Sequence, residues 1–212
     1  MELNELRYIV VDGPIGVGKT SLARKLAARF GAEPLLEAPG DNPFLERFYA
    51  DPQRHALAAQ LNFLFQRADQ VKQLAQQNLF SRGVVADFLL EKDRLFAALN
   101  LSEDELRLYH KIYGFLQPQS PRPDLVIALQ ASVDTLIERV RQRGIRYEQR
   151  ISADYLARLA DAYAHFFHGF DACPILFVNT EGLNFVDEPT HLDLLVQRIS
   201  QMRGSREFFN VA

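Results

Sequence analysis

Residues 13–20 read Gly13-Pro14-Ile15-Gly16-Val17-Gly18-Lys19-Thr20, a glycine-rich segment that ends in a lysine and a threonine. A short β-branched apolar run precedes it at residues 8–12, and residues 21–30 follow with apolar side chains at helical spacing. A strand, a glycine-rich turn and a helix in this order are the context of a phosphate-binding loop. A dinucleotide-binding turn would need a third glycine at the G-x-G-x-x-G spacing, and the chain has none there.

The loop predicts a nucleoside triphosphate site. Its glycines let several backbone N–H groups point into one concavity, which opens at the positive end of the following helix. Lys19 is expected to reach the β- and γ-phosphates, and the Thr20 hydroxyl to bind Mg²⁺. The residues expected to hold the nucleotide phosphates are Gly13, Pro14, Ile15, Gly16, Val17, Gly18, Lys19, Thr20 and Ser21.

Composition predicts a soluble cytoplasmic protein. The chain has 212 residues, of which 48% are hydrophobic, enough for one domain with a substantial core. Its formal charge of −3 gives no electrostatic footprint for nucleic acid. Cys173 is its single cysteine, which excludes an internal disulfide and a cysteine metal cluster. We find no apolar run of the roughly 18 residues that a membrane span needs, and no signal-peptide pattern at the N-terminus.

Four further apolar runs predict strands, and helical periodicity separates each from the next. This alternation predicts an α/β fold with a five-stranded parallel sheet flanked by helices, in one domain over residues 1–212. Right-handed crossovers bring the carboxyl ends of all strands to one edge, where ligands bind. Asp12, Glu37 and Asp87 fall at or just after strand ends, so we expect them near the phosphate loop; turn capping is the alternative for each. The four runs are residues 33–37, 83–87, 125–129 and 175–178.

Residues 53–79 have the periodicity of a long helix between the second and third strands. Gln60, Phe63 and Arg67 lie along one side of it, because seven residues make almost two helical turns. An amide and a guanidinium on one face can present donors and acceptors to a flat heterocycle. From spacing alone, a solvated helix surface is the favoured alternative.

An arginine cluster follows the fourth predicted strand. Arg139 and Arg143 are one helical turn apart and share a face, and Arg141 and Arg146 lie close by. A mobile arginine lid over a transferring phosphate explains this cluster, and we expect the lid at about residues 143–150. The alternative is a basic helix end that complements the helix dipole.

The C-terminal third carries weaker signals. Glu148 is either a salt-bridge partner within the lid or a ligand for sugar hydroxyls, and the pattern leaves both open. Residues 152–170 predict a helix rich in aromatic side chains, for which core or dimer packing is the expected use. Residues 190–202 predict a last helix, and a frayed tail is expected after Gly204.

These elements together resemble the deoxynucleoside kinase family, in particular its bacterial deoxyadenosine/deoxyguanosine kinase branch. The resemblance covers residues 13–185 and implies a P-loop kinase fold and a homodimer. It also implies ATP as phosphoryl donor, Mg²⁺, and a deoxynucleoside as acceptor. The motifs that carry it are residues 13–20, Glu37, Asn42-Pro43-Phe44-Leu45, Phe48-Tyr49, Gln60 with Arg67, Asp87 with Asp93, Arg139, Arg143 and Glu148-Gln149.

The resemblance implies a role for each site residue. Asp87 takes the position of the acidic base, while Lys19, Arg139 and Arg143 act on the phosphates, with Arg146 as a further nucleotide contact. Thr20, Glu37 and Asp87 lie at the metal. The base is contacted by Gln60, Arg67 and Asp93, and Phe96 packs on its face. The 3′-hydroxyl is held by Tyr49 and Glu148, and Glu37 lies beside the 5′-hydroxyl.

Two positions depart from the family pattern. Phe88 stands directly after the acid, where the family commonly has arginine, and Ile145 interrupts the usual Arg-Gly-Arg of the lid. Lys92, Arg94 and Arg146 are the candidates to supply the missing charge.

The leading hypothesis is transfer of the γ-phosphoryl group of ATP to a deoxynucleoside, preferably a purine. A nucleoside monophosphate kinase of the thymidylate kinase type is the nearest alternative, and it would need cations at the acceptor end. Glu37, Tyr49 and Glu148 suit an uncharged hydroxyl instead. A regulatory nucleotide switch is the alternative of another class, but we find no Asn-Lys-x-Asp guanine-binding motif.

Overall fold

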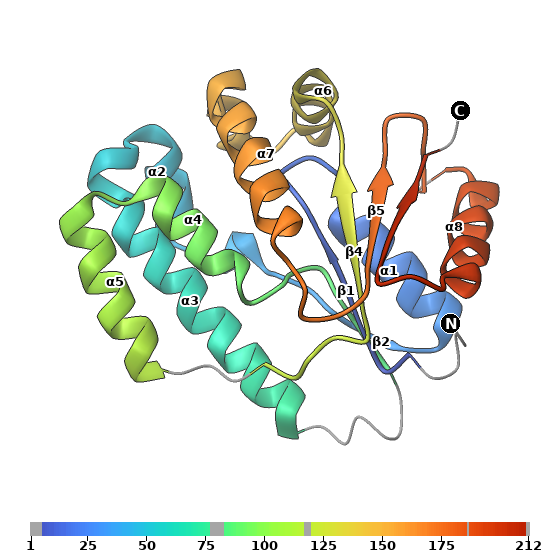
Figure 1. Cartoon of the computed structure of the whole chain (residues 1–212). Helices are drawn as coiled ribbons and strands as arrows, with labels where there is room; N and C mark the ends of the chain where they lie inside the picture. The colour runs from blue at the N-terminus through green and yellow to red at the C-terminus, as the bar shows by residue number, and fades with distance from the viewer. Residues whose placement is uncertain (1–5, 77–82, 117–119, 186, 211–212) are drawn as a thin grey trace.

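The computed structural model describes residues 6–76, 83–116, 120–185 and 187–210. A parallel sheet of six strands, in the order β2-β3-β1-β4-β5-β6, forms its centre (Figure 1). The predicted parallel α/β sheet is therefore confirmed, and the predicted count of five strands was wrong. The strands are β1 (Tyr8–Asp12), β2 (Glu33–Leu35), β3 (Val84–Ala86), β4 (Leu125–Gln130), β5 (Ile175–Asn179) and β6 (Arg206–Phe209).

The sixth strand lies in the segment that the sequence predicted to be a frayed tail. β6 pairs in parallel with β5, from Ile175 opposite Arg206 to Val178 opposite Phe209. The ring of Phe208 stacks on that of Phe177 with centroids 4.9 Å apart. The four residues of β6 alternate between exposed and half-buried positions, as expected of a short edge strand. So short a strand, with two charged residues, gives little local signal.

Helices cover both faces of the sheet. Figure 1 shows α1 and α8 on one side, and α7, α4 and α3 on the other. The predicted long helix is confirmed, although residues 77–79 of its expected range lie outside the described residues. The helices are α1 (Lys19–Phe30), α2 (Leu45–Ala50), α3 (Pro52–Gln76), α4 (Lys92–Asn100), α5 (Glu103–Leu116), α6 (Val133–Arg143), α7 (Ala153–His168) and α8 (Pro189–Gln201), with short 3₁₀ helices η2 (Pro39–Asp41) and η3 (Glu148–Arg150).

The core lies against the central strands. Every residue of β1 is buried, and α7 turns Tyr163 and Phe167 inward, so its aromatic side chains serve core packing. Polar caps fix the starts of the helices near the site: the hydroxyls of Ser132 and Ser152 accept from backbone N–H groups in the first turns of α6 and α7.

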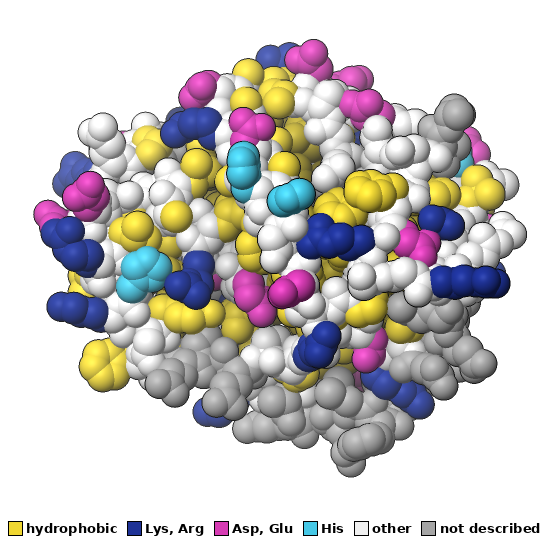
Figure 2. Space-filling view, in the orientation of Figure 1, with side chains coloured by type: hydrophobic (Ala, Val, Ile, Leu, Met, Phe, Trp, Pro, Cys, Tyr) yellow, Lys and Arg dark blue, Asp and Glu magenta, His cyan; other side chains and the backbone are white. Residues whose placement is uncertain are grey.

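The surface mixes charges of both signs. Figure 2 shows basic and acidic side chains interspersed over the visible face of the described residues. Within the described part of the chain, no helix has the length and apolar character needed to cross a bilayer.

Candidate active site

The glycine-rich segment between β1 and α1 forms one end of the site. Gly16 and Gly18 have φ angles of 87° and 101°, a backbone conformation that other residues rarely adopt. A Cβ atom on Gly16 would lie 2.7 Å from the carbonyl oxygen of Leu136, so α6 packs directly against this turn. The glycines therefore allow both the curl of the loop and its close approach to α6.

Lys19 begins α1 and folds back over the loop. Its ammonium donates to the carbonyl oxygens of Gly13 and Pro14 at 2.8 and 3.0 Å. Burial, together with the charge of Lys92, lowers the pKa of Lys19 to about 8. A buried ammonium beside another cation gains strongly from an anion, so this position favours a phosphate group.

A cavity of about 560 Å³ opens beside the loop, at the carboxyl end of the sheet. Most of the residues predicted for the site line it: Ile15, Gly16, Gly18, Lys19, Thr20, Ser21, Glu37, Tyr49, Gln60, Arg67, Asp87, Phe96, Arg143 and Glu148. The predicted residues that are not part of its wall are Gly13, Pro14, Val17, Asp93, Arg139 and Arg146.

Asp87 follows β3 and contacts the phosphate loop. Its Oδ2 atom accepts from the Thr20 hydroxyl at 2.5 Å, and its Oδ1 atom accepts from the backbone N–H of Glu37 at 2.7 Å. Burial raises the pKa of Asp87, and the hydrogen bond from Thr20 opposes that rise. The structure thus gathers the three residues that were predicted at the metal.

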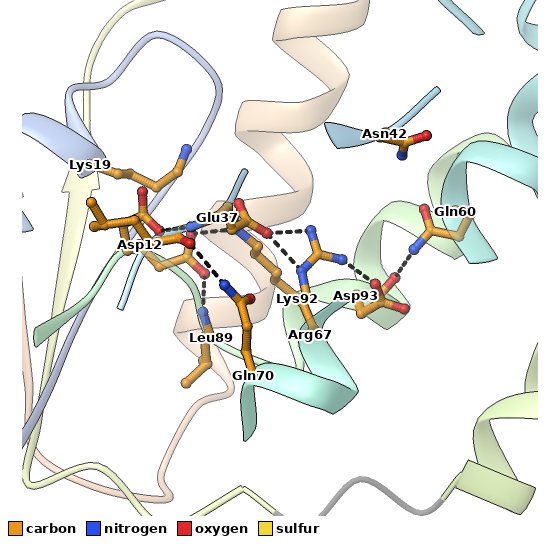
Figure 3. A network of polar contacts seen from close by, with 12 residues as sticks. Asp12, Lys19, Glu37, Asn42, Gln60, Arg67, Gln70, Leu89, Lys92 and Asp93 are labelled. Atoms are coloured by element: carbon orange, nitrogen blue, oxygen red, sulfur yellow. Dashed lines mark hydrogen bonds and ion pairs between the residues drawn. The ribbon is translucent and has the colours of Figure 1, made fainter. Parts of the chain in front are cut away.

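Glu37 lies between two cations (Figure 3). Its Oε1 atom accepts from Arg67 Nε at 2.7 Å, and its Oε2 atom lies 2.7 Å from Lys92 Nζ. Burial opposes the ionisation of Glu37, but Arg67 and Lys92 outweigh it and lower the pKa of this carboxyl to about 2. Glu37 is therefore a fixed anion on the cavity wall.

The far end of the network lies on α3 and α4. Arg67 forms a buried ion pair with Asp93, whose other carboxylate oxygen accepts from the Tyr109 hydroxyl at 2.5 Å. Gln60 donates its amide N–H to the backbone oxygen of Asp93 at 3.0 Å. Because Asp93 is fully buried and absent from the cavity wall, it orients Arg67 and Gln60, which do line the wall.

Another part of the cavity wall combines phenol and carboxyl groups, those of Tyr49, Tyr147 and Glu148. The Tyr49 and Tyr147 rings stack with centroids 6.0 Å apart. Glu148 pairs through Oε1 with Arg143 at 3.1 Å, while its buried Oε2 atom has no hydrogen-bond partner among the described residues. Burial raises the pKa of Glu148. An unpaired, buried acceptor on a cavity wall suits a ligand hydroxyl.

The two central arginines of the predicted lid point to different places. Arg143 reaches the cavity wall beside Glu148. Arg139 instead donates to the hydroxyl and carbonyl oxygens of Thr180 at 2.8 and 2.6 Å, and to the Val17 carbonyl oxygen at 3.4 Å. It therefore braces the phosphate loop against the segment after β5.

Sequence reasoning missed two tyrosines of the site and left the role of Asp12 open. Asp12 is fully buried and accepts from the backbone N–H groups of Gly13 and Leu89, at 2.7 and 3.0 Å. It also accepts from the Tyr163 hydroxyl at 3.1 Å. Asp12 thus acts as a turn cap below the loop. Tyr109 and Tyr163 lie in apolar helical stripes, where nothing in the sequence marks their hydroxyls for carboxylates.

A glycine-rich phosphate loop at the edge of a parallel sheet, with a threonine and carboxylates beside it, defines a P-loop phosphotransferase. The family profile described as deoxynucleoside kinase matches residues 9–202, and the chain belongs to this family. The reaction of its class is therefore deoxynucleoside phosphorylation.

Individual relatives agree with this assignment. A deoxyguanosine kinase of Bacillus subtilis (strain 168) is 35% identical over 162 residues, covering 76% of this chain and 78% of the relative. A deoxyadenosine/deoxycytidine kinase of the same organism is 29% identical over 202 residues, or 92% of each chain. The structure of a deoxyadenosine kinase from M. mycoides with bound dATP matches with a TM-score of 0.79 and 24% identity, over 92% of this chain and 100% of that one.

Proposed function

We propose that the protein transfers the γ-phosphoryl group of ATP to the 5′-hydroxyl of a purine deoxynucleoside, deoxyadenosine or deoxyguanosine, in nucleotide salvage. The observation that carries the proposal is that one cavity is lined both by Lys19 with the phosphate loop and by Tyr49 and Glu148. Lys19 and the loop amides favour a triphosphate. The buried Oε2 atom of Glu148, which has no hydrogen-bond partner among the described residues, favours the hydroxyl of a neutral sugar.

The purine preference is supported by the relatives. The similar proteins include a deoxyguanosine kinase and a deoxyadenosine/deoxycytidine kinase. Gln60 and Arg67 reach the cavity wall with an amide and a guanidinium, which can bind the polar edge of a base. Phe96 lines the same cavity and offers an aromatic face for stacking.

Catalysis in this proposal is mainly alignment and charge stabilisation. Lys19 and the loop amides hold the β- and γ-phosphates, and Arg143 approaches from the lid over residues 143–150. Tyr49 and Glu148 hold the 3′-hydroxyl, and Glu37 lies beside the 5′-hydroxyl. Asp87 accepts the proton of the 5′-hydroxyl late in the transfer, and its raised pKa suits that role.

The residues present fit Mg²⁺. The ion is commonly held by one or two carboxylates together with substrate phosphates, and P-loop enzymes use the loop hydroxyl and a strand-end aspartate. Thr20 and Asp87 are in direct contact, and Glu37 adjoins them through its backbone N–H. When bound there, Mg²⁺ would neutralise charge on the β- and γ-phosphates.

Steady-state assays with ATP and Mg²⁺ across the four deoxynucleosides test the proposal. We expect kcat/KM for deoxyguanosine or deoxyadenosine to exceed that for thymidine by about 10-fold or more, the scale that pocket contacts provide. A preference for thymidine would overturn the purine assignment. ATP hydrolysis without any nucleoside product would overturn the kinase and favour a nucleotide switch.

We also propose a single domain that forms a homodimer and acts in the cytoplasm, where its ATP donor is found. The interface is not expected on α7, whose Tyr163 and Phe167 are buried in the core. Large exposed apolar side chains, among them Phe65 on α3, support a face on α3 and α5 instead. Phe115 is 90% exposed, and Leu108, seven residues earlier on the same face of α5, is 47% exposed.

A further inference from the structure

A buried lysine on the cavity wall joins two carboxylates, those of Glu37 and Asp12. Lys92 opens α4, and its side chain is only 2% exposed. Its ammonium lies 2.7 Å from Glu37 Oε2 and 3.7 Å from Asp12 Oδ1 (Figure 3). A charge this deeply buried is costly unless opposite charges surround it, so the two anions fix the position of Lys92.

The structure distinguishes Lys92 from Arg94 and Arg146, the two other cations that could replace the arginine missing from the family pattern. Phe88 stands at that position and is fully buried in an apolar cluster, outside the cavity wall. The Arg94 guanidinium lies over the Tyr113 ring, 5.7 Å from its centroid, and Arg146 is not part of the wall. Lys92 alone of the three candidates lines the cavity.

We propose that Lys92 is a positioning residue for phosphoryl transfer, which fixes the Glu37 carboxylate beside the acceptor hydroxyl and ties it to the base of the phosphate loop through Asp12. The inference rests on the proposed function, because it assigns a task within that reaction. It explains how the chain works with phenylalanine at position 88: the cation comes from the first turn of α4.

The two cations around Glu37 have separate tasks. Arg67 holds Oε1 and also pairs with Asp93, so it belongs to the end that faces the base. Lys92 holds Oε2 and belongs to the phosphate end. If the Lys92 charge is removed, Glu37 keeps one partner and is free to rotate about it. Asp12 retains its bonds from Gly13, Leu89 and Tyr163, so the phosphate loop keeps its shape.

A double-mutant cycle between Lys92→Met and Glu37→Gln tests this assignment. We expect Lys92→Met to lower kcat about 100-fold, as a misplaced group of the reaction does, with KM for ATP changed less than about 3-fold. Because Lys92 acts through Glu37, the double variant should be no slower than Glu37→Gln alone. Arg94→Met, which removes a positive charge two residues further along α4, should retain wild-type kcat.

Additive losses in the cycle, or a Lys92→Met variant with wild-type kcat, would overturn the inference. Circular dichroism establishes whether Lys92→Met folds. If it does not, Lys92→Ala is assayed with and without propylammonium, which is expected to restore turnover; no restoration would likewise overturn the inference. A wild-type protein that phosphorylates no deoxynucleoside refutes the proposed function itself. An active wild type with an additive cycle refutes only the role of Lys92.

Discussion

Two carboxylates beside the phosphate loop differ sharply in their surroundings. Glu37 faces Arg67 and Lys92, and its pKa is about 2. Asp87 faces a hydroxyl and a backbone N–H, and burial raises its pKa. The environments therefore separate a permanent anion from a group that can exchange a proton, which is how enzymes divide such tasks between paired acids.

This difference predicts a pH dependence. Asp87 has to be ionised to accept a proton, so kcat/KM of the wild type falls as the pH falls through the pKa of Asp87, which burial raises and a bound Mg²⁺ would lower. Arg67 and Lys92 lower the pKa of Glu37 to about 2, so its protonation does not contribute in the assay range. Asp87→Asn is expected to lower kcat about 10²–10⁴-fold and to remove this fall of kcat/KM at low pH, with ATP binding retained in calorimetry. Glu37→Gln should still show the fall. If the fall persists unchanged in Asp87→Asn, another group accepts the proton of the 5′-hydroxyl.

At the residue scale, local patterns predicted the loop, and tertiary contacts decided the rest. Lys19 and Thr20 follow from one short motif. Asp93 is different: the resemblance implied a contact with the nucleoside base. In the structure Asp93 is buried, pairs with Arg67 and does not line the cavity. Arg139 likewise shares a helix face with Arg143 but is drawn to Thr180. Which partner a long side chain finds depends on elements far away in the sequence.

The element that carries the site is the loop together with the helix packed on it. Gly16 meets the carbonyl of Leu136 on α6, whereas a Cβ atom on Gly18 would meet open space. Both glycines have positive φ, which costs other residues about 1–2 kcal/mol. Gly18→Ala should lose only this strain energy, while Gly16→Ala should lose more, because the backbone of α6 has to move. Urea unfolding measures both, and equal losses would contradict the packing argument.

The sequence did not predict β6, because this strand forms through its pairing with β5 and not through an apolar pattern of its own. The central strands are buried on both faces and appear in the sequence as continuous apolar runs. β6 is a four-residue edge strand, which exists because β5 offers a free side and Phe177 a ring to stack on. No window of its own sequence contains that information.

For the whole molecule, the exposed apolar side chains of α5 predict association of two copies. Phe115→Glu places a charge at the most exposed of them and is expected to convert a dimer into a monomer in light-scattering chromatography. Leu194→Glu, at a 44% exposed position on α8, is the matched control and should remain dimeric. A wild-type monomer, or dissociation by the α8 variant alone, would contradict an interface on α5.

The molecule as a whole brings a phosphate-binding loop and groups suited to the hydroxyls of a neutral sugar into one cavity. The most direct test offers the enzyme ATP with deoxyguanosine or deoxyadenosine and, separately, with their 5′-monophosphates, and identifies the products by phosphorus NMR. We expect each nucleoside to yield its 5′-monophosphate with one ADP, while the monophosphates are left unchanged. Conversion of the monophosphates to diphosphates, with the nucleosides untouched, would contradict it.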